Sequence, residues 1–277
     1  MDCRQIEKIK SEAAAKRLLS KECWNSKKRI CPRCSERKIY KLLDKRYRCK
    51  GCGYTFHDFT GRWINKCNLS CLQWIKIIGL FESECSILGI AKSLKISYNT
   101  AYKAVTHLRL SILSHSHNWQ QWASNIETSA ASHRIGSWKN APKETFPPVF
   151  GAIKNGDQII SEYLPCLTVE DVLSLGLRLI RRNNLIYSSS FENYHSIFFY
   201  GLFDHENFDS IEFSRVKFHQ ELHDFWRYVA KRLCVGVSAN KFPLFYKEIE
   251  YRYNNKGKIS EEIVRFLCDH IPETIAK

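Results

Sequence analysis

The sequence predicts a multidomain protein in which a small cysteine-rich domain and a helical region precede an α/β domain. Two Cys-x2-Cys pairs lie close together near the N-terminus, which is typical of a small metal-stabilised domain. Apolar residues then recur at helical spacing over residues 70–113, and β-type runs alternate with helical patterns after residue 119. These changes of pattern divide the chain into residues 1–66, 67–118 and 119–277.

Positive charge is concentrated at the N-terminal end of the chain. Residues 1–66 contain 19 Lys and Arg and 7 Asp and Glu, a net charge of +12, whereas all 277 residues carry +15. Such a segment is typical of surfaces that bind polyanions, although charge alone leaves a solubilising tail open. The sequence has no apolar run as long as a membrane span and no signal-peptide pattern, so we expect a soluble, cytoplasmic protein.

The cysteine pairs have the spacing of a structural zinc site. Fourteen residues separate the two pairs, and each short turn directs two sulfurs to one metal at about 2.3 Å. We therefore expect one structural Zn²⁺ per chain, held in a zinc ribbon, and we expect the other eight cysteines to be buried or inert thiols. The expected zinc ligands are Cys31, Cys34, Cys49 and Cys52.

Two short strands are predicted between the cysteine pairs, over residues 39–42 and 46–48, with a turn at residues 43–45. Gly51 and Gly53 supply the backbone freedom that the second pair requires. Basic residues alternate with tyrosines along this segment, which favours binding to the phosphates of a nucleic acid, while a protein partner stays open. The expected DNA contacts are Lys38, Lys41, Arg46, Arg48 and Lys50.

Three helices are predicted over residues 70–113. Ser70 can cap the first helix, and the second spans about residues 86–94. After a short turn at residues 95–97, the third helix spans about residues 98–113. This size and order predict a helix-turn-helix, with an ordinary helical hairpin as the alternative. Residues on the exposed face of the last helix would reach base edges in the major groove: Tyr98, Asn99, Thr100 and Lys103.

The last part of the chain predicts a mixed α/β domain. Two β-type runs over residues 149–164 meet at Asn155-Gly156, a sequence typical of tight hairpins. A helix over residues 169–182 follows, and a buried strand, Leu185–Tyr187, then leads into three serines. Another helix is predicted near residues 220–233. This order of elements is compatible with a ribonuclease-H-like layered fold.

Together these features resemble the ISXO-type insertion-sequence transposases of the DDE superfamily, over nearly the whole chain. The firmest matches are the segments CPRC…CKGC, HDFWRYVAKRL and FPLFYKEIEYRYNNK. The resemblance implies a ribonuclease-H-like core in which an Asp-Asp-Glu triad holds two Mg²⁺ ions for DNA strand cleavage and joining. It also implies double-stranded DNA as the partner and a prokaryotic, nucleoid-associated protein, and it leaves a homo-oligomer open.

The positions of that triad are substituted in this chain. By the resemblance, Ser129, Ser189 and His223 stand where the two aspartates and the glutamate would be. Mg²⁺ prefers anionic oxygen ligands, and two hydroxyls and an imidazole supply none. We therefore expect no catalytic residues, no bound Mg²⁺ and no strand transfer.

The sequence thus favours a transposase-like DNA-binding protein that has lost strand transfer: a repressor, an accessory factor, or a domesticated or decaying transposase. The alternative is an active, metal-dependent transposase in which displaced carboxylates, such as Glu127, Glu192 and Asp224, replace the triad. A hydrolase built on Ser189 and His223 lacks an identified orienting acid. A protein-binding adaptor is disfavoured by the basic N-terminal segment.

Overall fold

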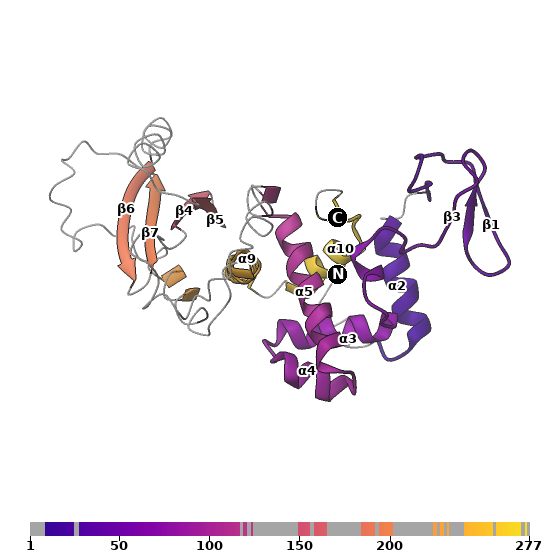
Figure 1. The fold of residues 1–277 in the computed structure, drawn as a ribbon, viewed down its shortest axis with the longest axis horizontal. Coiled ribbons are helices and arrows are strands. Elements are labelled where there is room, and N and C mark those ends of the chain that lie inside the picture. The colour runs from indigo at the N-terminus through magenta and orange to yellow at the C-terminus, as the bar shows by residue number, and fades with distance from the viewer. Residues whose placement is uncertain are drawn as a thin grey trace. The chain divides into compact units, whose positions relative to one another are not determined.

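The computed structural model divides the chain into two compact units, one formed by Met1–His115 with Gly257–Lys277 and the other by Ser116–Lys256 (Figure 1). No helix in the part of the chain that the structure describes is both long and apolar enough to cross a membrane. The residues that the structure describes are 9–24, 28–116, 119–120, 123, 149–155, 158–164, 184–191, 194–201, 224–225, 228–229, 232, 241–256, 259–272 and 275.

A small antiparallel sheet forms the ribbon of the first unit. Its strands are β1 (Ile39–Lys41), β2 (Tyr47–Cys49) and β3 (Thr55–Phe56), in the order β1-β2-β3. The first two strands agree to within one residue with those expected from the sequence. The third was not expected, because a strand of two residues has no alternation that a pattern could reveal.

A helix that the sequence analysis did not predict, α2 (Glu12–Trp24), precedes the ribbon. Ser11 caps it: the Ser11 hydroxyl accepts a hydrogen bond from the backbone N–H of Ala14 at 3.2 Å. The apolar side of α2 is buried and consists of Ala15, Leu19 and Cys23.

Three helices follow the ribbon: α3 (Cys71–Glu82), α4 (Ile87–Leu94) and α5 (Tyr98–Ser114). Each begins after a serine whose side chain accepts a hydrogen bond from the backbone N–H three residues further on. The bounds agree with those expected from the sequence to within about one residue. Between α4 and α5, Lys95 has a left-handed backbone, with φ of 53°, which ends α4 sharply. The buried side of α5 includes Ala101, Val105, Leu108 and Ile112.

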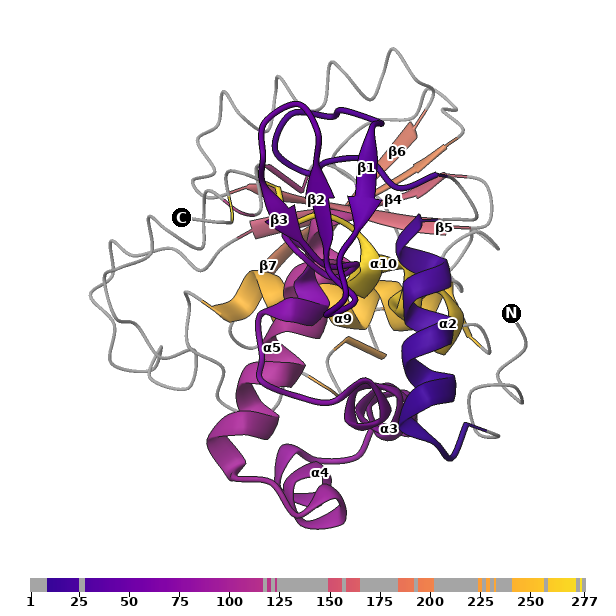
Figure 2. The same cartoon turned by 90° about the vertical axis from the view of Figure 1, so that its right-hand side faces the viewer.

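The C-terminal helix α10 (Ile259–Cys268) belongs to the first unit, although the change of sequence pattern placed it in one region with residues 119–277. It packs against α2, α3, α5 and the short 3-10 helix η1 (Trp63–Asn65) (Figure 2). The buried Arg62 side chain donates a hydrogen bond to the carbonyl of Cys268. The amphipathic pattern of α10 predicts that one side is buried, but a pattern cannot say against which partner.

The second unit contains a four-stranded sheet in the order β5-β4-β7-β6. The predicted hairpin is present: β4 (Val149–Asn155) pairs antiparallel with β5 (Gln158–Leu164). The predicted strand over residues 185–187 is longer than expected, because β6 (Asn184–Phe191) continues through the three serines. It pairs antiparallel with β7 (Tyr194–Gly201), which was not predicted, and β7 runs parallel to β4. The predicted helix over residues 169–182 lies outside the described residues.

Helix α9 (Phe242–Asn254) packs against β5 in the second unit. Its last residue, Asn254, is bonded to the β5 backbone: the Asn254 amide donates to the carbonyl of Ile159 at 2.7 Å and accepts from the Ile159 N–H at 2.9 Å. Four charged residues of α9 are buried and form two ion pairs, Lys247–Glu250 and Glu248–Arg252. These charges neutralise one another within the helix, as buried charges must.

Candidate metal centre and nucleic-acid interface

Four cysteine thiols converge in the ribbon, two from each Cys-x2-Cys turn, which we call a knuckle. The Sγ atoms of Cys31 and Cys52 lie 3.6 Å apart, and those of Cys34 and Cys49 lie 3.5 Å apart. All four lie within 4.8 Å of one another. A tetrahedral Zn²⁺ with Zn–S bonds of ~2.3 Å sets its ligands about 3.8 Å apart. The thiols therefore fit one structural Zn²⁺, and the prediction made from their spacing is confirmed.

The backbones of the two knuckles make equivalent turns. The residue after each second cysteine has a left-handed conformation, with φ of 58° at Ser35 and 70° at Gly53. The N–H of Ser35 donates to the carbonyl of Cys31 at 2.9 Å, and the N–H of Gly53 donates to that of Cys49 at 3.1 Å. Gly51, which was also expected to need backbone freedom, does not have a positive φ.

The thiols of the centre differ in acidity. Hydrogen bonds, foremost that from the backbone N–H of Cys52, lower the pKa of the Cys49 thiol to about 7. At Cys34 the backbone N–H of Glu36 acts to lower the pKa, but hydrogen bonds with the neighbouring thiols and desolvation raise it to about 12. The hydrogen bonds thus favour a thiolate at Cys49 more than at Cys34, and the positive charge of a bound metal would favour the thiolate at both.

The zinc centre is continuous with a very small hydrophobic core. Cys31 and Cys49 are buried together with Phe56, and four partly buried side chains surround them: Trp24, Ile39, Tyr47 and Tyr54. Cys34 and Cys52 are exposed. So few apolar side chains cannot hold a ribbon together without the metal.

Hydrogen bonds of Asp58 connect the ribbon to α2. Its carboxylate accepts hydrogen bonds from Trp24 Nε1 at 2.7 Å and from Arg29 Nε at 2.6 Å. The Arg29 guanidinium also lies over the Tyr47 ring, with Cζ 4.8 Å from the ring centroid. Burial acts to raise the pKa of the Asp58 carboxyl, but the hydrogen bonds from Arg29 and Trp24 outweigh it and hold that pKa below its ordinary value. Helix α2 and the ribbon are thereby joined into one domain.

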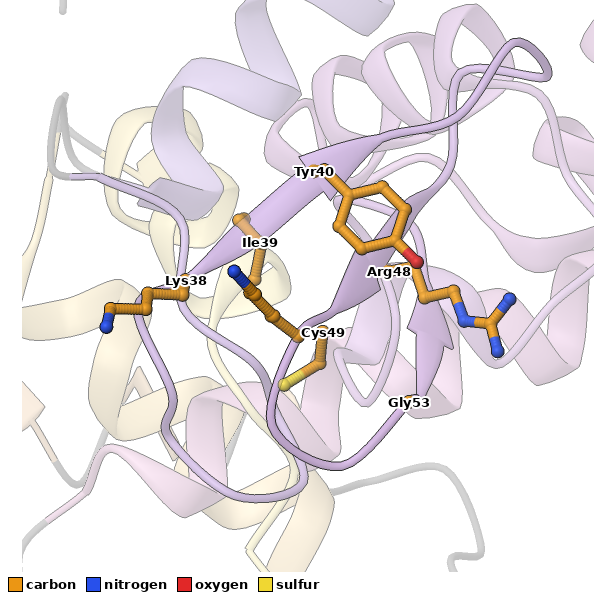
Figure 3. Close-up of a pocket in the computed structure, with 7 residues that line it drawn as sticks. Lys38, Ile39, Tyr40, Arg48, Cys49 and Gly53 are labelled. Atoms are coloured by element: carbon orange, nitrogen blue, oxygen red, sulfur yellow. The ribbon is translucent and has the colours of Figure 1, made fainter.

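The hairpin of β1 and β2 has two chemically different sides. Successive residues of a strand point to opposite sides, so Ile39, Tyr47 and Cys49 are turned to the ribbon core and their neighbours are turned away. We call the second side the outer face, and its residues are Lys38, Tyr40, Arg48 and Lys50, all of them exposed. Together with Ile39, Cys49 and Gly53, they line an open hollow of about 720 Å³ at the surface of the ribbon (Figure 3).

Three of the five DNA contacts expected in the ribbon lie on the outer face, and two do not. Lys41 pairs with Tyr47 on the other side of the hairpin. Arg46 lies in the turn between the strands, where its Nε donates to the Asp44 carboxylate at 2.6 Å. Tyr40, which was not among the expected contacts, lies on the outer face directly opposite Arg48.

The contacts expected on α5 lie in its first two turns. Tyr98, Asn99 and Lys103 are exposed, and the Tyr98 ring stacks on Tyr102 with their centroids 6.3 Å apart. Thr100 is partly buried and belongs to the cap of the helix. Its backbone N–H donates to the Ser97 hydroxyl at 3.1 Å, and the two hydroxyls lie 2.8 Å apart.

Of the three positions that the resemblance implies for the triad, one falls within the described residues. Ser189 lies in β6 and is paired in register with Ser196 of β7. Ser129 and His223 lie outside the described residues, as do the acids Glu127 and Glu192. The other acid considered, Asp224, is helical and partly buried.

The convergent thiols, the paired knuckles and the three-stranded sheet define residues 31–56 as a four-thiolate zinc ribbon. Residues 10–55 match the family model of the transposase zinc-ribbon domain, of the IS1595 type. The match begins before α2, which agrees with the union of α2 and the ribbon in one domain. It supports a relationship to transposases and thereby a role in binding nucleic acid. Neither the comparison with curated proteins nor that with solved structures found a match.

Proposed function

We propose that this protein is a transposase-related DNA-binding protein that binds duplex DNA through the ribbon and through α4 and α5. The proposal rests on the ribbon, whose hairpin has two chemically different sides and which matches the family model of the transposase zinc-ribbon domain. One side of its hairpin packs into the zinc-bound core, whereas Lys38, Arg48 and Lys50 project from the other. An exposed cluster of cations on a rigid support is suited to the DNA backbone.

The pair α4 and α5 supports a second contact, as a helix-turn-helix. The two helices contact each other, three residues connect them, and α3 packs against both. In this arrangement the second helix enters the major groove with its N-terminal residues towards the bases. Asn99 can recognise adenine through two hydrogen bonds, and Lys103 can bind guanine or a phosphate.

The two contacts have different roles in this proposal. The ribbon supplies affinity that is independent of sequence, because its cations contact phosphates. The N-terminal end of α5 supplies preference among sequences, because its polar side chains contact bases. A protein of this kind can act as a repressor or as an accessory factor at transposon ends.

Strand transfer is not part of the proposed function. The support is that, by the resemblance, two hydroxyls and an imidazole stand where three carboxylates would be. Two metal ions in one site repel each other and need several anionic ligands. The active transposase with displaced carboxylates is not favoured by an observation on the described residues.

Binding of the zinc-loaded full chain to a library of duplex DNA, at several salt concentrations, tests the proposal. Arg48→Ala should weaken binding to all sequences and lower the slope of log affinity against log salt by about 1. The matched control is Arg265→Ala, since Arg265 is an exposed arginine of α10. Asn99→Ala should instead flatten the sequence preference and leave the salt slope unchanged. Equal effects of Arg48→Ala and Arg265→Ala would remove the ribbon from the interface.

A further inference from the structure

We propose that the outer face of the ribbon binds an unpaired stretch of DNA, in which phosphates contact Lys38, Arg48 and Lys50 and a base stacks on Tyr40. The inference rests on the proposed function, because it takes the ribbon to bind DNA. It goes further by naming the form of DNA that this face recognises and a stacking residue at its centre.

The strand register places these four side chains together. Tyr40 of β1 and Arg48 of β2 are direct partners in the antiparallel pair. One step further along, the backbone N–H of Lys50 donates to the carbonyl of Lys38 at 2.9 Å, which continues the pairing past the ends of both strands. Residues two apart on a strand share a side, so the two cross-strand pairs form one surface.

Tyr40 is an aromatic residue left at the surface. Its exposed fraction is 48 %, whereas Tyr47 on the opposite side of the same hairpin is packed beside Phe56 and beneath Arg29. Within the described residues, no ring contact or hydrogen bond involves the Tyr40 side chain. The Tyr40 ring is large and apolar, and a rigid strand holds it among cations. When a flat ligand covers this ring, its surface is removed from water, which is energetically favourable.

The cations of the outer face are available to a ligand. Among the described residues, Arg48 and Lys50 form no ion pair, in contrast to Arg46, which the Asp44 carboxylate holds at 2.6 Å. Lys38 has Glu36 nearby, but that carboxylate accepts hydrogen bonds from the backbone N–H groups of Arg37 and Lys38 at 2.7 and 2.9 Å. The outer face therefore keeps a strong positive charge. This charge favours an anionic ligand such as a phosphodiester over a neutral or cationic one.

The composition of this face favours an unpaired strand over a continuous duplex. Inside a duplex, neighbouring bases cover both faces of each base, so away from the ends a protein ring has no base to stack on. An aromatic platform flanked by cations that follow the backbone is the arrangement by which proteins hold single strands. The hollow that Figure 3 shows beside Tyr40 has a volume of about 720 Å³, within the range of about 300–1,000 Å³ of ligand pockets.

The test compares three DNA probes of one sequence on the zinc-loaded full chain: a single strand, a blunt duplex, and a duplex with an unpaired overhang. Two substitutions separate the ring from its hydroxyl, since Tyr40→Phe keeps the ring and Tyr40→Leu keeps only apolar bulk. Tyr40→Phe should bind all three probes as the wild type does. Tyr40→Leu should weaken the single strand and the overhang by about 5- to 100-fold and change the blunt duplex less than about twofold. Zinc content, measured for each variant, shows that the ribbon is intact.

Three results would overturn the inference, and the second of them separates it from the proposed function. If Tyr40→Phe weakens binding as much as Tyr40→Leu, the hydroxyl contacts a phosphate and no base stacks on the ring. If the wild type binds the blunt duplex with a steep salt dependence and neither substitution matters for any probe, the inference fails while the proposed function stands. If the wild type binds none of the three probes, both fail.

Discussion

Ser35 and Gly53 occupy equivalent places in the zinc ribbon. Each follows the second cysteine of a knuckle, each has a left-handed backbone, and each donates its N–H to the carbonyl of the first cysteine, at 2.9 and 3.1 Å. The two turns are therefore the same, but only one of them contains a glycine. A serine in this conformation is strained by its Cβ, and a glycine is not.

Substitutions at these two positions should have opposite effects on zinc affinity. Gly53→Ala should weaken it about fivefold, because a left-handed L-residue costs about 1 kcal/mol and metal binding is coupled to folding. A Cβ at Gly53 would meet no atom within 4 Å, so the cost is conformational and not steric. Ser35→Gly should strengthen zinc binding by up to the same factor. Competition with a chelator measures both, and a change of the same sign in the two variants would contradict the equivalence.

The geometry of the zinc centre predicts the number of zinc ions that each chain binds. The purified chain should contain one Zn²⁺, and Cys49→Ser should lose it, because a hydroxyl does not replace a zinc-binding thiolate. Cys67→Ser is the control, since Cys67 lies outside the cluster of convergent thiols. Elemental analysis measures the zinc content of the wild type, Cys49→Ser and Cys67→Ser. A Cys49→Ser protein that keeps its full zinc content would exclude the assignment.

The features that the sequence predicted well are local. Four cysteines at fixed spacing identify a zinc centre because each knuckle is a short turn. Ser70, Ser86 and Ser97 mark the beginnings of α3, α4 and α5 because a capping serine lies within three residues of the N–H that it binds. Helix α2 has the same signal in Ser11, followed by a run of alanines, so it could have been predicted.

What the sequence did not predict depends on contacts between distant residues. Asp58 and Trp24 are 34 residues apart, and nothing near either one indicates their hydrogen bond. Likewise β7 and the position of α10 depend on partners far away in the chain. In the candidate site, charge counting included Arg46, whereas the geometry pairs it with Asp44. A pattern says which residues are charged, and only the structure says which charges are already neutralised.

The hydrogen bonds of Asp58 should be important for stability. Asp58→Asn keeps the size of the side chain but removes its charge beside Arg29, so it should lower the free energy of unfolding at neutral pH by about 1–2 kcal/mol. Asp44→Asn is the matched control. Asp44 also accepts from an arginine, but it is exposed, and its loss should have little effect. Denaturant unfolding of both variants with zinc present measures the difference, and equal values would contradict a special role for Asp58.

The contact between His115 and Asp269 should make stability depend on pH. His115 Nε2 lies 2.9 Å from the Asp269 carboxylate, which raises the pKa of the imidazole although burial acts to lower it. A raised histidine pKa gives stability that is present below the unfolded value, near 6.5, and is lost as pH rises through the folded value.

Asp269→Asn should therefore lower the melting temperature more at about pH 6 than at about pH 8.5. The effect should be small, about 0.2–1 kcal/mol, because the pair is partly exposed. Burial lowers the pKa of His57, His107 and His270. These groups therefore make stability depend on pH in the opposite direction to His115. The contributions of His57 and His107 cancel when the variant is compared with the wild type at each pH, whereas Asp269 also acts to raise the pKa of His270, so the difference between the two pH values reports on His115 and His270 together. A destabilisation that is equal at both pH values would show that His115 is neutral in the folded protein.

The proposed substitution of the triad gives the last prediction. The wild type should neither nick nor join DNA with Mg²⁺ or Mn²⁺, because the ions that would stabilise the attacking and leaving oxygens have no carboxylates to hold them. A triple variant with Ser129→Asp, Ser189→Asp and His223→Glu should gain affinity for divalent metals. Calorimetry measures this gain directly, and a metal-dependent rise in melting temperature measures it independently.

A second triple variant tests whether metal binding depends on the geometry of the site or only on the added negative charge. Three acids placed at serines elsewhere, by Ser83→Asp, Ser93→Asp and Ser116→Asp, add similar negative charge without a common site. If the triad positions converge, only the first variant should bind Mn²⁺ tightly, because dispersed carboxylates hold a metal far less well than several that surround it. Equal metal binding by both variants would show that charge alone is responsible. Metal-dependent cleavage by the wild type that Asp224→Ala abolishes would instead establish the enzyme with displaced carboxylates.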